Sequence, residues 1–351
     1  MTLDDLVGQI RAAHDGHTPL RIRGAGSKDF YGGMLASEVL DVAGYRGIVS
    51  YEPSELYITA RGGTSLSEIE AALEEKGQML AFEPPHFSGA TLGGCVAAGL
   101  SGPRRQQAGA VRDFVLGVKL LDGRGQVLDF GGQVMKNVAG YDVSRLLAGS
   151  LGTLGVLAEV TLKVLPKPVA EQTLAFEMNE VEALGKLNQW GGQPLPISAS
   201  FWFAGQLWLR LSGARAAVEA ACRKLGGRPV GDAAKHWTAI REQTNPAFAG
   251  NILWRLSLPS TAAPLAFDNP QAIEWGGGQR WLSGEIDPAQ VRAAAAKAGG
   301  HAVLYRAPES LRCREGAFAP LAPALLALHR RLKKSFDPKG IFNPGRLYAE
   351  F

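Results

Sequence analysis

The 351-residue chain has little cysteine, no long apolar run and no concentration of charge of one sign. Its three cysteines, Cys95, Cys222 and Cys313, are widely spaced and form no Cys-x-x-Cys pair. This argues against zinc, an iron–sulfur cluster and a disulfide framework. No run approaches the roughly 18 apolar residues of a membrane-spanning helix. Lys and Arg exceed Asp and Glu by only 37 to 33, and no basic stripe with interleaved aromatics points to nucleic acid.

The composition is that of a globular protein, with 46% hydrophobic residues, and the length predicts two domains. Residues 1–20 are typical of an amphipathic helix with early acidic residues and lack the basic start and apolar block of a signal peptide. We therefore expect a protein of a reducing compartment, in the cytoplasm.

The best candidate for a domain boundary is "LPKPVAEQ" (165–172), where two prolines interrupt the pattern. We expect a first domain over 1–168, a second over 169–320, and a helix and tail over 321–351 that return to the first domain. In the second, two stretches that begin at 206 and 279 each predict strand, helix, strand. They share Trp-Leu, Ser-Gly and Lys-x-Gly-Gly. We interpret them as an internal duplication on one antiparallel α+β sheet. The alternative is that two unrelated amphipathic helices came to be flanked by similar turn residues independently.

The segment "RIRGAGSK" (21–28) predicts a strand that runs into a glycine-rich loop. Such a loop lets consecutive backbone amides cup an anion, and Ser27 and Lys28 would add a hydroxyl and a positive charge. It is neither a Walker A loop nor G-x-G-x-x-G, because position 29 is Asp. A simple strand-to-loop turn explains it about as well.

A second glycine-rich segment, "GATLGG" (89–94), predicts a short helix that begins at Thr91 and could grip a pyrophosphate opposite the first loop. The alternative is an alanine/glycine helix packed in a core. A third, 136–162, has glycines at 140, 149, 152 and 155, whose backbone could approach a flat ring closely.

Taken in order, "RGAGSK", "EPPHFSGATLGG", "VRDFVLGVKLLDGRG", "KNVAGYDVSRLLAGSLGTLGVLAEVTL" and "DPKGIFNPGRLY" resemble the FAD-linked oxidases of the vanillyl-alcohol-oxidase/PCMH fold. With "EPPHF", "SGPRR" and "VMKNVAGYD", the chain is similar to the FAD-binding E-subunit family of bacterial glycolate oxidases. The resemblance implies an α+β fold, with a PCMH-type FAD-binding domain of two α+β subdomains and a second, smaller antiparallel α+β (ferredoxin-like) domain.

The same resemblance implies the cofactor contacts. The residues carried over are Arg23, Gly24, Ala25, Gly26, Ser27, Lys28, Pro85, His86, Gly89, Ala90, Thr91, Gly93, Gly94, Gly155, Val156 and Asn343. Covalent members attach the flavin through a histidine in the first loop, whereas this loop ends in Ser27-Lys28. We therefore predict non-covalent FAD.

Catalysis on a 2-hydroxy acid needs a cation for the carboxylate and a base for the hydroxyl proton. The H-x-G-D-G-N-x-H metal motif of catalytic relatives is absent, so no metal is expected. The weak catalytic candidates are His86, Arg104 and Arg105. Loop packing explains His86 equally well, and the arginines could equally form a solvated surface pair or meet a partner's carboxylates.

The leading hypothesis is the FAD-binding subunit of a heteromeric complex that oxidises glycolate to glyoxylate, with an electron-relay or assembly role. Its partners would be a catalytic FAD-binding sister subunit and an iron–sulfur subunit. The alternatives are a self-sufficient FAD-dependent 2-hydroxy-acid dehydrogenase and a structural subunit that no longer binds FAD. The basic amphipathic segment 320–336 could associate peripherally with a membrane, although packing of its leucine face on the domain is favoured.

Overall fold

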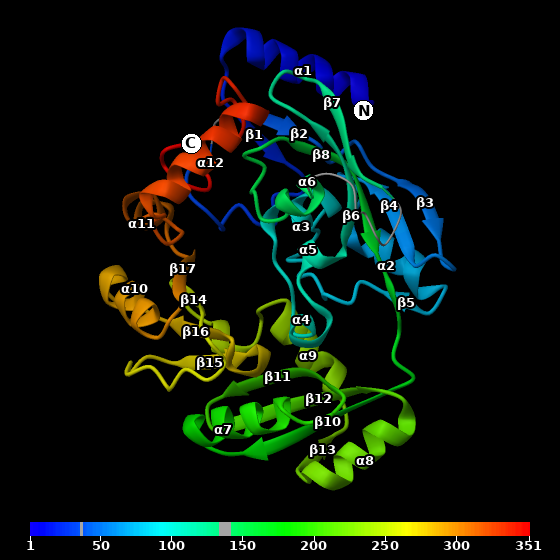
Figure 1. Ribbon diagram of the computed structural model, residues 1–351, viewed down its shortest axis with the longest axis vertical. Coiled ribbons are helices and arrows are strands. Elements are labelled where there is room, and N and C mark those ends of the chain that lie inside the picture. Colours follow the sequence, from blue (N-terminus) through cyan, green and yellow to red (C-terminus); the bar gives the residue numbers. More distant parts are fainter. Residues whose placement is uncertain (36–37, 133–141) are drawn as a thin grey trace.

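The computed structural model describes residues 1–35, 38–132 and 142–351 of the chain. Figure 1 shows a first region, with the blue and cyan elements, beside a second region that contains the green and yellow sheet. The elements of the first region are α1 (Leu3–Gly16), β1 (Leu20–Arg23), β2 (Glu38–Asp41), β3 (Ile48–Glu52), β4 (Tyr57–Arg61), α2 (Leu66–Glu74), β5 (Gln78–Met79), α3 (Leu92–Ala98), α4 (Arg105–Ala108), α5 (Val111–Phe114), β6 (Val115–Leu121), β7 (Val127–Gly131), α6 (Val143–Leu146), β8 (Val156–Lys163) and β9 (Leu165–Pro166).

The described residues of the first region form three separate sheets, the smallest of which pairs β5 with β9. β1 and β2 pair in parallel, and β3-β4-β8-β6-β7 form a five-stranded antiparallel sheet. β6 and β7 form a hairpin, in which the Asp122 carboxylate accepts the amides of Arg124 and Gln126 and so closes the turn. β4, β6 and β8 bury their side chains against α2 and α3 in one hydrophobic core.

The second region contains one eight-stranded sheet with helices packed on it. Its elements are β10 (Ala170–Glu177), α7 (Glu180–Gly191), β11 (Ile197–Phe203), β12 (Gln206–Gly213), α8 (Arg215–Leu225), β13 (Arg228–Val230), α9 (Ala233–Arg241), η1 (Pro246–Phe248), β14 (Leu253–Ser257), β15 (Gln271–Glu274), η2 (Trp275–Gly277), β16 (Gln279–Ser283), α10 (Pro288–Lys297), β17 (His301–Arg306) and α11 (Glu309–Glu315).

The strand order β13-β10-β12-β11-β15-β16-β14-β17 divides this sheet into two halves that meet between β11 and β15. The first half follows the β-α-β-β-α-β order of a ferredoxin-like unit. The second half repeats the same strand arrangement, with coil over 258–270 in place of the first helix. This is the topology that the predicted duplication requires, and the α+β fold class is confirmed.

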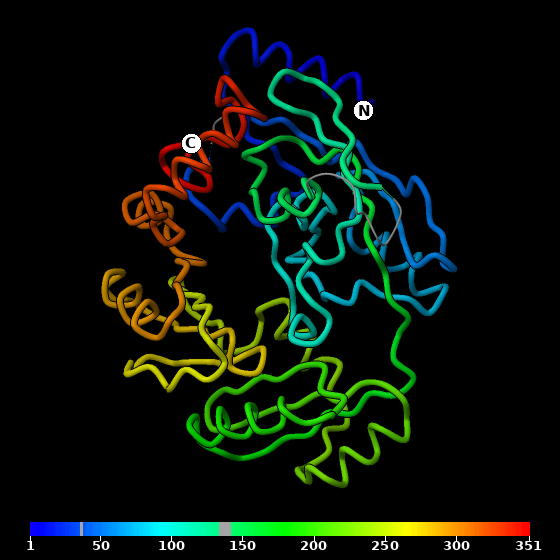
Figure 2. The backbone as a smooth tube through the Cα atoms, in the orientation of Figure 1, coloured from blue at the N-terminus to red at the C-terminus, as the bar shows by residue number. Residues whose placement is uncertain are grey.

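The C-terminal segment returns to the first region through α12 (Pro323–Phe336) and the tail beyond it. Figure 2 shows the red end of the tube beside the blue N-terminal segment. Phe342 pairs with Leu20 of β1 and is buried in a core together with Leu6 and Ile10 of α1. The sequence-distant ends of the chain therefore form one subdomain.

The helix α12 packs differently from the prediction. Leu332 and Phe336 contact the core, but Leu325 and Leu328 are half exposed. The buried residue of this helix is instead Lys333, whose Nζ donates to Asp337 and to two backbone carbonyls at 2.7 Å each. Three well-placed acceptors offset the cost of burying this cation.

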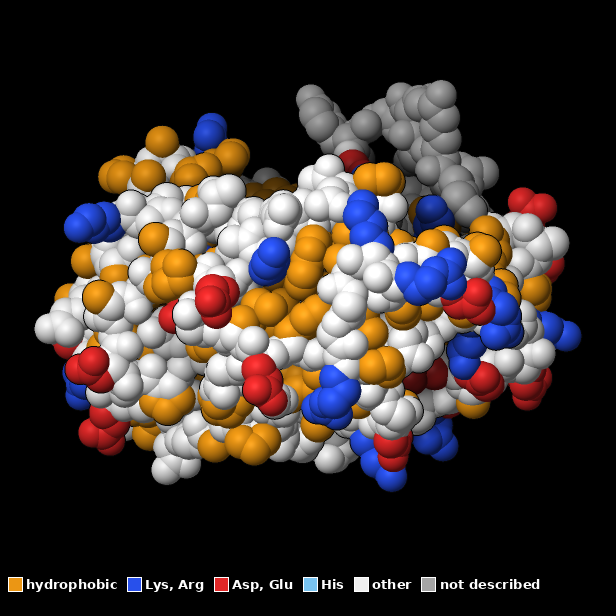
Figure 3. Space-filling model, turned by 90° about the horizontal axis from the view of Figure 1, so that it is seen from below, with side chains coloured by type: hydrophobic (Ala, Val, Ile, Leu, Met, Phe, Trp, Pro, Cys, Tyr) orange, Lys and Arg blue, Asp and Glu red, His pale blue; other side chains and the backbone are white. Residues whose placement is uncertain are grey.

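The surface on the side of the second region carries charges of both signs, interspersed with hydrophobic side chains that gather across the middle (Figure 3). None of the helices among the described residues is long and apolar enough to cross a membrane.

Candidate functional site: a cradle after the first strand

A cavity lies where β1 ends, between the loop 24–30, α3 and the C-terminal tail. The residues that line it are Arg21, Ile22, Arg23, Gly24, Gly26, Ser27, Lys28, Asp29, Leu35, Thr91, Gly94, Ala97, Ala98, Leu151, Asn343 and Arg346. Gly24 lets the first loop approach Thr91 closely, because a Cβ at this position would stand 2.3 Å from Thr91 Oγ1. The two glycine-rich segments therefore face one another, as expected. We call this cavity the cradle.

The loop of the cradle leaves its backbone donors free. Among the described residues, no acceptor takes a hydrogen bond from the amides of residues 24–28, although Asp29 and Tyr31 donate to Gly26 and Lys28. Gly26 has φ 71°, a left-handed conformation that favours glycine. Unpaired backbone amides on a turn of this kind form an anion-binding concavity.

The charges of the cradle are unbalanced. Among the described residues, four basic side chains line it, against Asp29 alone. Burial lowers the pKa of Lys28, whose nearest polar partner in the described chain is the hydroxyl of Ser27 at 3.4 Å. The Nε of Arg21 is buried without a hydrogen-bond partner. Cations left unpaired in a partly buried site indicate an anionic ligand.

The carboxyl-terminal residues complete the cradle. The Asn343 side chain accepts from the amide of Ile22 at 2.9 Å and donates to the carbonyl of Leu151 at 2.6 Å. Arg346 donates to the carbonyls of Gly33, Lys28 and Asp29, and burial lowers its pKa to about 10. Arg346 thus fixes the end of the loop that supplies the free amides, and Asn343 fixes the strand that precedes it.

The cradle brings together half of the predicted cofactor residues: Arg23, Gly24, Gly26, Ser27, Lys28, Thr91, Gly94 and Asn343. Gly89 lies beside Ala25: a Cβ added at Gly89 would stand 3.9 Å from the Cβ of Ala25. Ala25, Pro85, His86, Gly89, Ala90 and Gly93 do not line the cradle.

Gly155 and Val156, predicted to present backbone to the adenine end or the ring system, do not line the cradle. A Cβ on Gly155 would meet the carbonyl of Leu121 at 2.6 Å, and Val156 is buried with the α1 side chains. Gly93 likewise serves the packing of α3 on the backbone of Gly62. The motif positions 133–141, with Gly140, lie outside the described residues.

The comparisons decide the family. The family model described as "FAD binding domain" matches residues 1–131, and "FAD linked oxidases, C-terminal domain" matches residues 320–347. Glycolate oxidase subunit GlcE of Escherichia coli K12 is 49% identical over 98% of this chain and 97% of its own length. The chain belongs to the GlcE family. Its cofactor is FAD, and the family is one of FAD-linked oxidoreductases.

More distant relatives share only part of this GlcE-family chain. Glycolate oxidase subunit GlcD of Bacillus subtilis is 30% identical over 51% of this chain and 39% of its own length. D-lactate dehydrogenase of Anaerostipes hadrus is 27% identical over 51% and 38%. Alkyldihydroxyacetonephosphate synthase aligns with TM-scores of 0.66 and 0.67 at 16% identity, over 97% of this chain and about three quarters of its own. That likeness establishes the PCMH-type fold.

The cradle fits the phosphates of FAD. Its free amides and its unpaired Lys28 and Arg21 are donors for a pyrophosphate. The missing Cβ of Gly24 leaves the backbone open to close approach.

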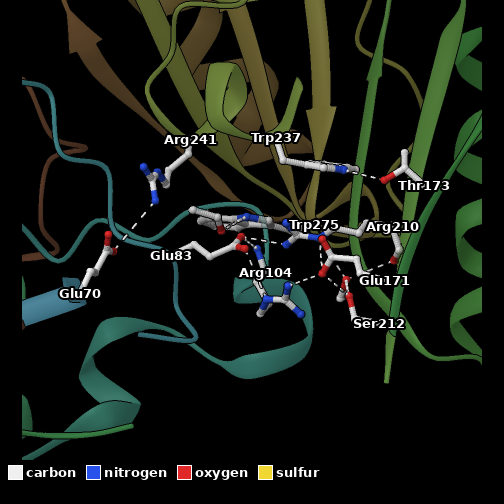
Figure 4. A network of polar contacts seen from close by, with 12 residues as sticks. Glu70, Glu83, Arg104, Glu171, Thr173, Arg210, Ser212, Trp237, Arg241 and Trp275 are labelled. Carbon is white, nitrogen blue, oxygen red and sulfur yellow. Dashed lines mark hydrogen bonds and ion pairs between the residues drawn. The ribbon is translucent and has the colours of Figure 1, made fainter. Parts of the chain in front are cut away.

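The predicted arginine pair has other partners. Arg104 is 5% exposed; its Nε donates to Glu83 and its Nη2 to Glu171, at 3.3 and 2.7 Å. Arg210 donates to the same Glu83 at 2.8 Å, and Ser212 to Glu171 at 2.7 Å. Figure 4 shows this group, which we call the interdomain cluster (Glu83, Arg104, Glu171, Arg210).

The cluster is electrically balanced. Burial alone would raise the pKa of Glu83, but Arg210 and Arg104 outweigh it and hold the pKa below its ordinary value. Arg105 lies 4.2 Å from the ring centroid of Trp275. Arg104 is therefore not a solvated surface residue, and neither arginine lines the cradle.

His86, the other catalytic candidate, lies beside the second region. Its Nε2 is 3.1 Å from Glu70 Oε2 but without the alignment of a hydrogen bond. Its backbone amide donates to the Glu242 carboxylate. Among the described residues, no group of three His, Cys, Asp or Glu side chains could hold a metal ion.

A second, smaller cavity lies between loop 100–103 and the sheet, lined among others by Arg255, Glu274 and Tyr305. Burial raises the pKa of Glu274 to about 7, although hydrogen bonds from Trp281 and Gln279 oppose the shift. Arg255 donates to Tyr31 Oη at 3.0 Å and has no carboxylate within 4 Å in the described chain.

Sequence reasoning missed several of these residues. Arg21 and Arg346 lie within the quoted segments 21–28 and 337–348, so their place in these motifs could have suggested them. Glu242, Arg255 and Glu274 carry no local signal, because only the folding of the second region brings them to the first.

Proposed function

We propose that this chain is the FAD-binding subunit of a heteromeric complex that oxidises glycolate to glyoxylate. The observation that supports it is the cradle, with its free amides over 24–28 and its unpaired Lys28. FAD would supply the acceptor for the two electrons that the oxidation of an alcohol to a carbonyl releases. The names of the GlcE and GlcD relatives support glycolate as the substrate of the complex.

The flavin would be held without a covalent bond. The described cradle lining contains no His, Tyr or Cys side chain, and burial raises the pKa of nearby Cys95 to about 12, so its thiolate is scarce. Precipitation of the holoprotein with hot acid should release a yellow supernatant. Yellow colour that stays in the pellet contradicts this part of the proposal.

Electrons would leave to partner subunits: a catalytic FAD-binding sister and an iron–sulfur subunit. The ion pairs of Arg104 with Glu83 and Glu171 support a relay or assembly role, because this arginine is not free to bind an acid. Anaerobic glycolate titration should leave the flavin spectrum of the isolated subunit unchanged and bleach it only when the sister subunit is present. Rapid turnover of glycolate by the isolated subunit with a dye acceptor would refute the relay role.

A second candidate function is a self-sufficient 2-hydroxy-acid dehydrogenase. The cavity with Arg255 and Glu274 favours it, since it combines an unpaired guanidinium with a carboxyl whose pKa lies near neutrality. Bleaching of the isolated holoprotein by glycolate, abolished by Arg255→Met, would support this candidate over the relay. Bleaching that survives Arg255→Met would exclude this cavity as the site.

A further inference from the structure

Residues 83–89 ("EPPHFSG") lie between the cradle and the second region in a strained conformation. Glu83, Phe87 and Ser88 have φ values of 46°, 44° and 64°. Non-glycine residues rarely adopt this left-handed region, and such conformations persist only where the surroundings enforce them. Three of them within six residues indicate that contacts from elsewhere hold the segment.

The carboxylate of Glu242, in the second region, makes several of the contacts that hold this segment. Glu242, directly after α9, accepts the amide of Phe87 at 2.8 Å and that of His86 at 3.1 and 3.2 Å through its two oxygens. Arg241 Nε donates to Glu242 at 2.8 Å and so orients the acceptor. Two consecutive backbone donors are therefore satisfied by a side chain some 155 residues away in sequence.

The other end of the segment is anchored in the same way. Glu83 is held by Arg210 of β12, at 2.8 Å, and by Arg104. The strained segment is thus fixed at both ends by side chains of the second region, through Arg210 and Glu242.

The middle of the segment reaches the cradle. The Phe87 ring centroid lies 5.5 Å from Lys28 Nζ, and the ring packs edge-on against Phe30 at 5.6 Å. Burial lowers the pKa of Lys28, and the charge of Glu242 opposes that shift. The charge of Glu242 therefore acts on the lysine that faces the cradle.

We propose that Glu242 is a positioning residue of the FAD site: it holds residues 86–87 so that Phe87 covers Lys28, and thereby couples the position of the second region to the cradle. The inference rests on the proposed function in taking FAD as the occupant of the cradle. A displacement of the second region would release the segment and expose Lys28.

The test compares the full chain with Glu242→Gln, which is nearly isosteric, and Glu242→Ala. The matched control is Glu219→Gln, which removes a charge from the exposed face of α8. Hydrogen exchange of residues 83–89 is measured without FAD, and FAD affinity by titration of flavin fluorescence. We expect exchange in Glu242→Ala to be on the order of tenfold faster or more, FAD to bind roughly tenfold more weakly, and Glu219→Gln to match the wild type.

Each outcome decides a separate point. Unchanged exchange in both Glu242 variants overturns the hold on the segment. Faster exchange with unchanged FAD affinity overturns the role as a positioning residue. A wild-type protein that takes up no FAD overturns the proposed function and the FAD part of the inference, while the exchange data still decide whether Glu242 holds the segment. If Glu242→Ala fails to fold, Glu242→Gln carries the comparison.

Discussion

The cradle and the interdomain cluster both gather basic side chains, but they treat their charges in opposite ways. In the cluster, Arg104 and Arg210 meet Glu83 and Glu171 at distances from 2.7 to 3.3 Å, and the charges balance. In the cradle, Lys28 and Arg21 have no such partners in the described chain. The paired charges of the cluster therefore stabilise the fold, whereas the unpaired charges of the cradle are available to an anionic ligand.

The same contrast explains why the arginine pair after the glycine-rich segment is not part of the cradle. Arg104 is withdrawn into the cluster by two carboxylates, one of them from β10. A buried ion pair is costly to break from one side, because the remaining charge stays unpaired in the interior. The substitutions below exploit this asymmetry.

The largest effect is expected for Arg210→Met. Removal of this cation leaves Glu83 buried with Arg104 alone, so we expect the free energy of unfolding to fall by about 3–5 kcal/mol, as measured by urea denaturation. Because the pKa of Glu83 lies below its ordinary value, the stability that it contributes is present above about pH 4.5 and is lost as the pH falls further. Arg228→Met, at an exposed position of β13, should change stability by less than about 0.5 kcal/mol. Equal effects would show that the cluster is dispensable.

Glu274 belongs to neither group of charges, because this buried carboxyl keeps its proton. Its pKa is raised from 4.5 to about 7, so the folded state binds more protons than the unfolded state between these pH values. The contribution of this carboxyl to stability should fall as the pH rises through that window, by about 3 kcal/mol in total, whereas that of His236, whose pKa burial lowers to about 4, should rise. Glu274→Gln should flatten this slope in urea titrations from pH 5 to 8, whereas Glu219→Gln should retain it. A pH slope of Glu274→Gln equal to that of the wild type would contradict the raised pKa.

Gly24→Ala tests the closeness of the two glycine-rich segments. The new Cβ would lie 2.3 Å from Thr91 Oγ1, so Thr91 has to move and the cradle has to widen or fill. We expect FAD to bind at least tenfold more weakly, or about 1.4 kcal/mol, in fluorescence titrations. Gly8→Ala in α1, where nothing lies within 4 Å of a new Cβ, is the control and should bind FAD as the wild type does.

The smallest effect is expected at Lys28, where one substitution should raise the stability of the protein without FAD and lower its affinity for FAD. Lys28→Met removes a buried cation without an ion-pair partner, so the protein without FAD should gain about 1 kcal/mol of stability. The same change removes a phosphate donor, so FAD affinity should fall. Thermal unfolding with and without FAD separates the two. A loss of stability without FAD would place Lys28 with the paired charges of the cluster instead.

Local patterns were sufficient for much of the secondary structure. The two strand–helix–strand units of the second region follow from alternation and turn residues, which act over a few positions. The order of glycine motifs likewise pointed to an anion-binding loop. Patterns failed for α12, where amphipathic spacing predicted a buried leucine face but did not indicate that Lys333 would find three acceptors.

The sequence by itself determined the loop 24–28, because its glycines and the residues beside them dictate a backbone with free amides. Only the tertiary structure decided which side chains stand around it. Arg346 arrives from the tail, Glu242 from the end of α9, and Arg104 is drawn away by Glu171. Backbone conformation is a local property, whereas the pairing of charges depends on which distant elements the packed cores bring together.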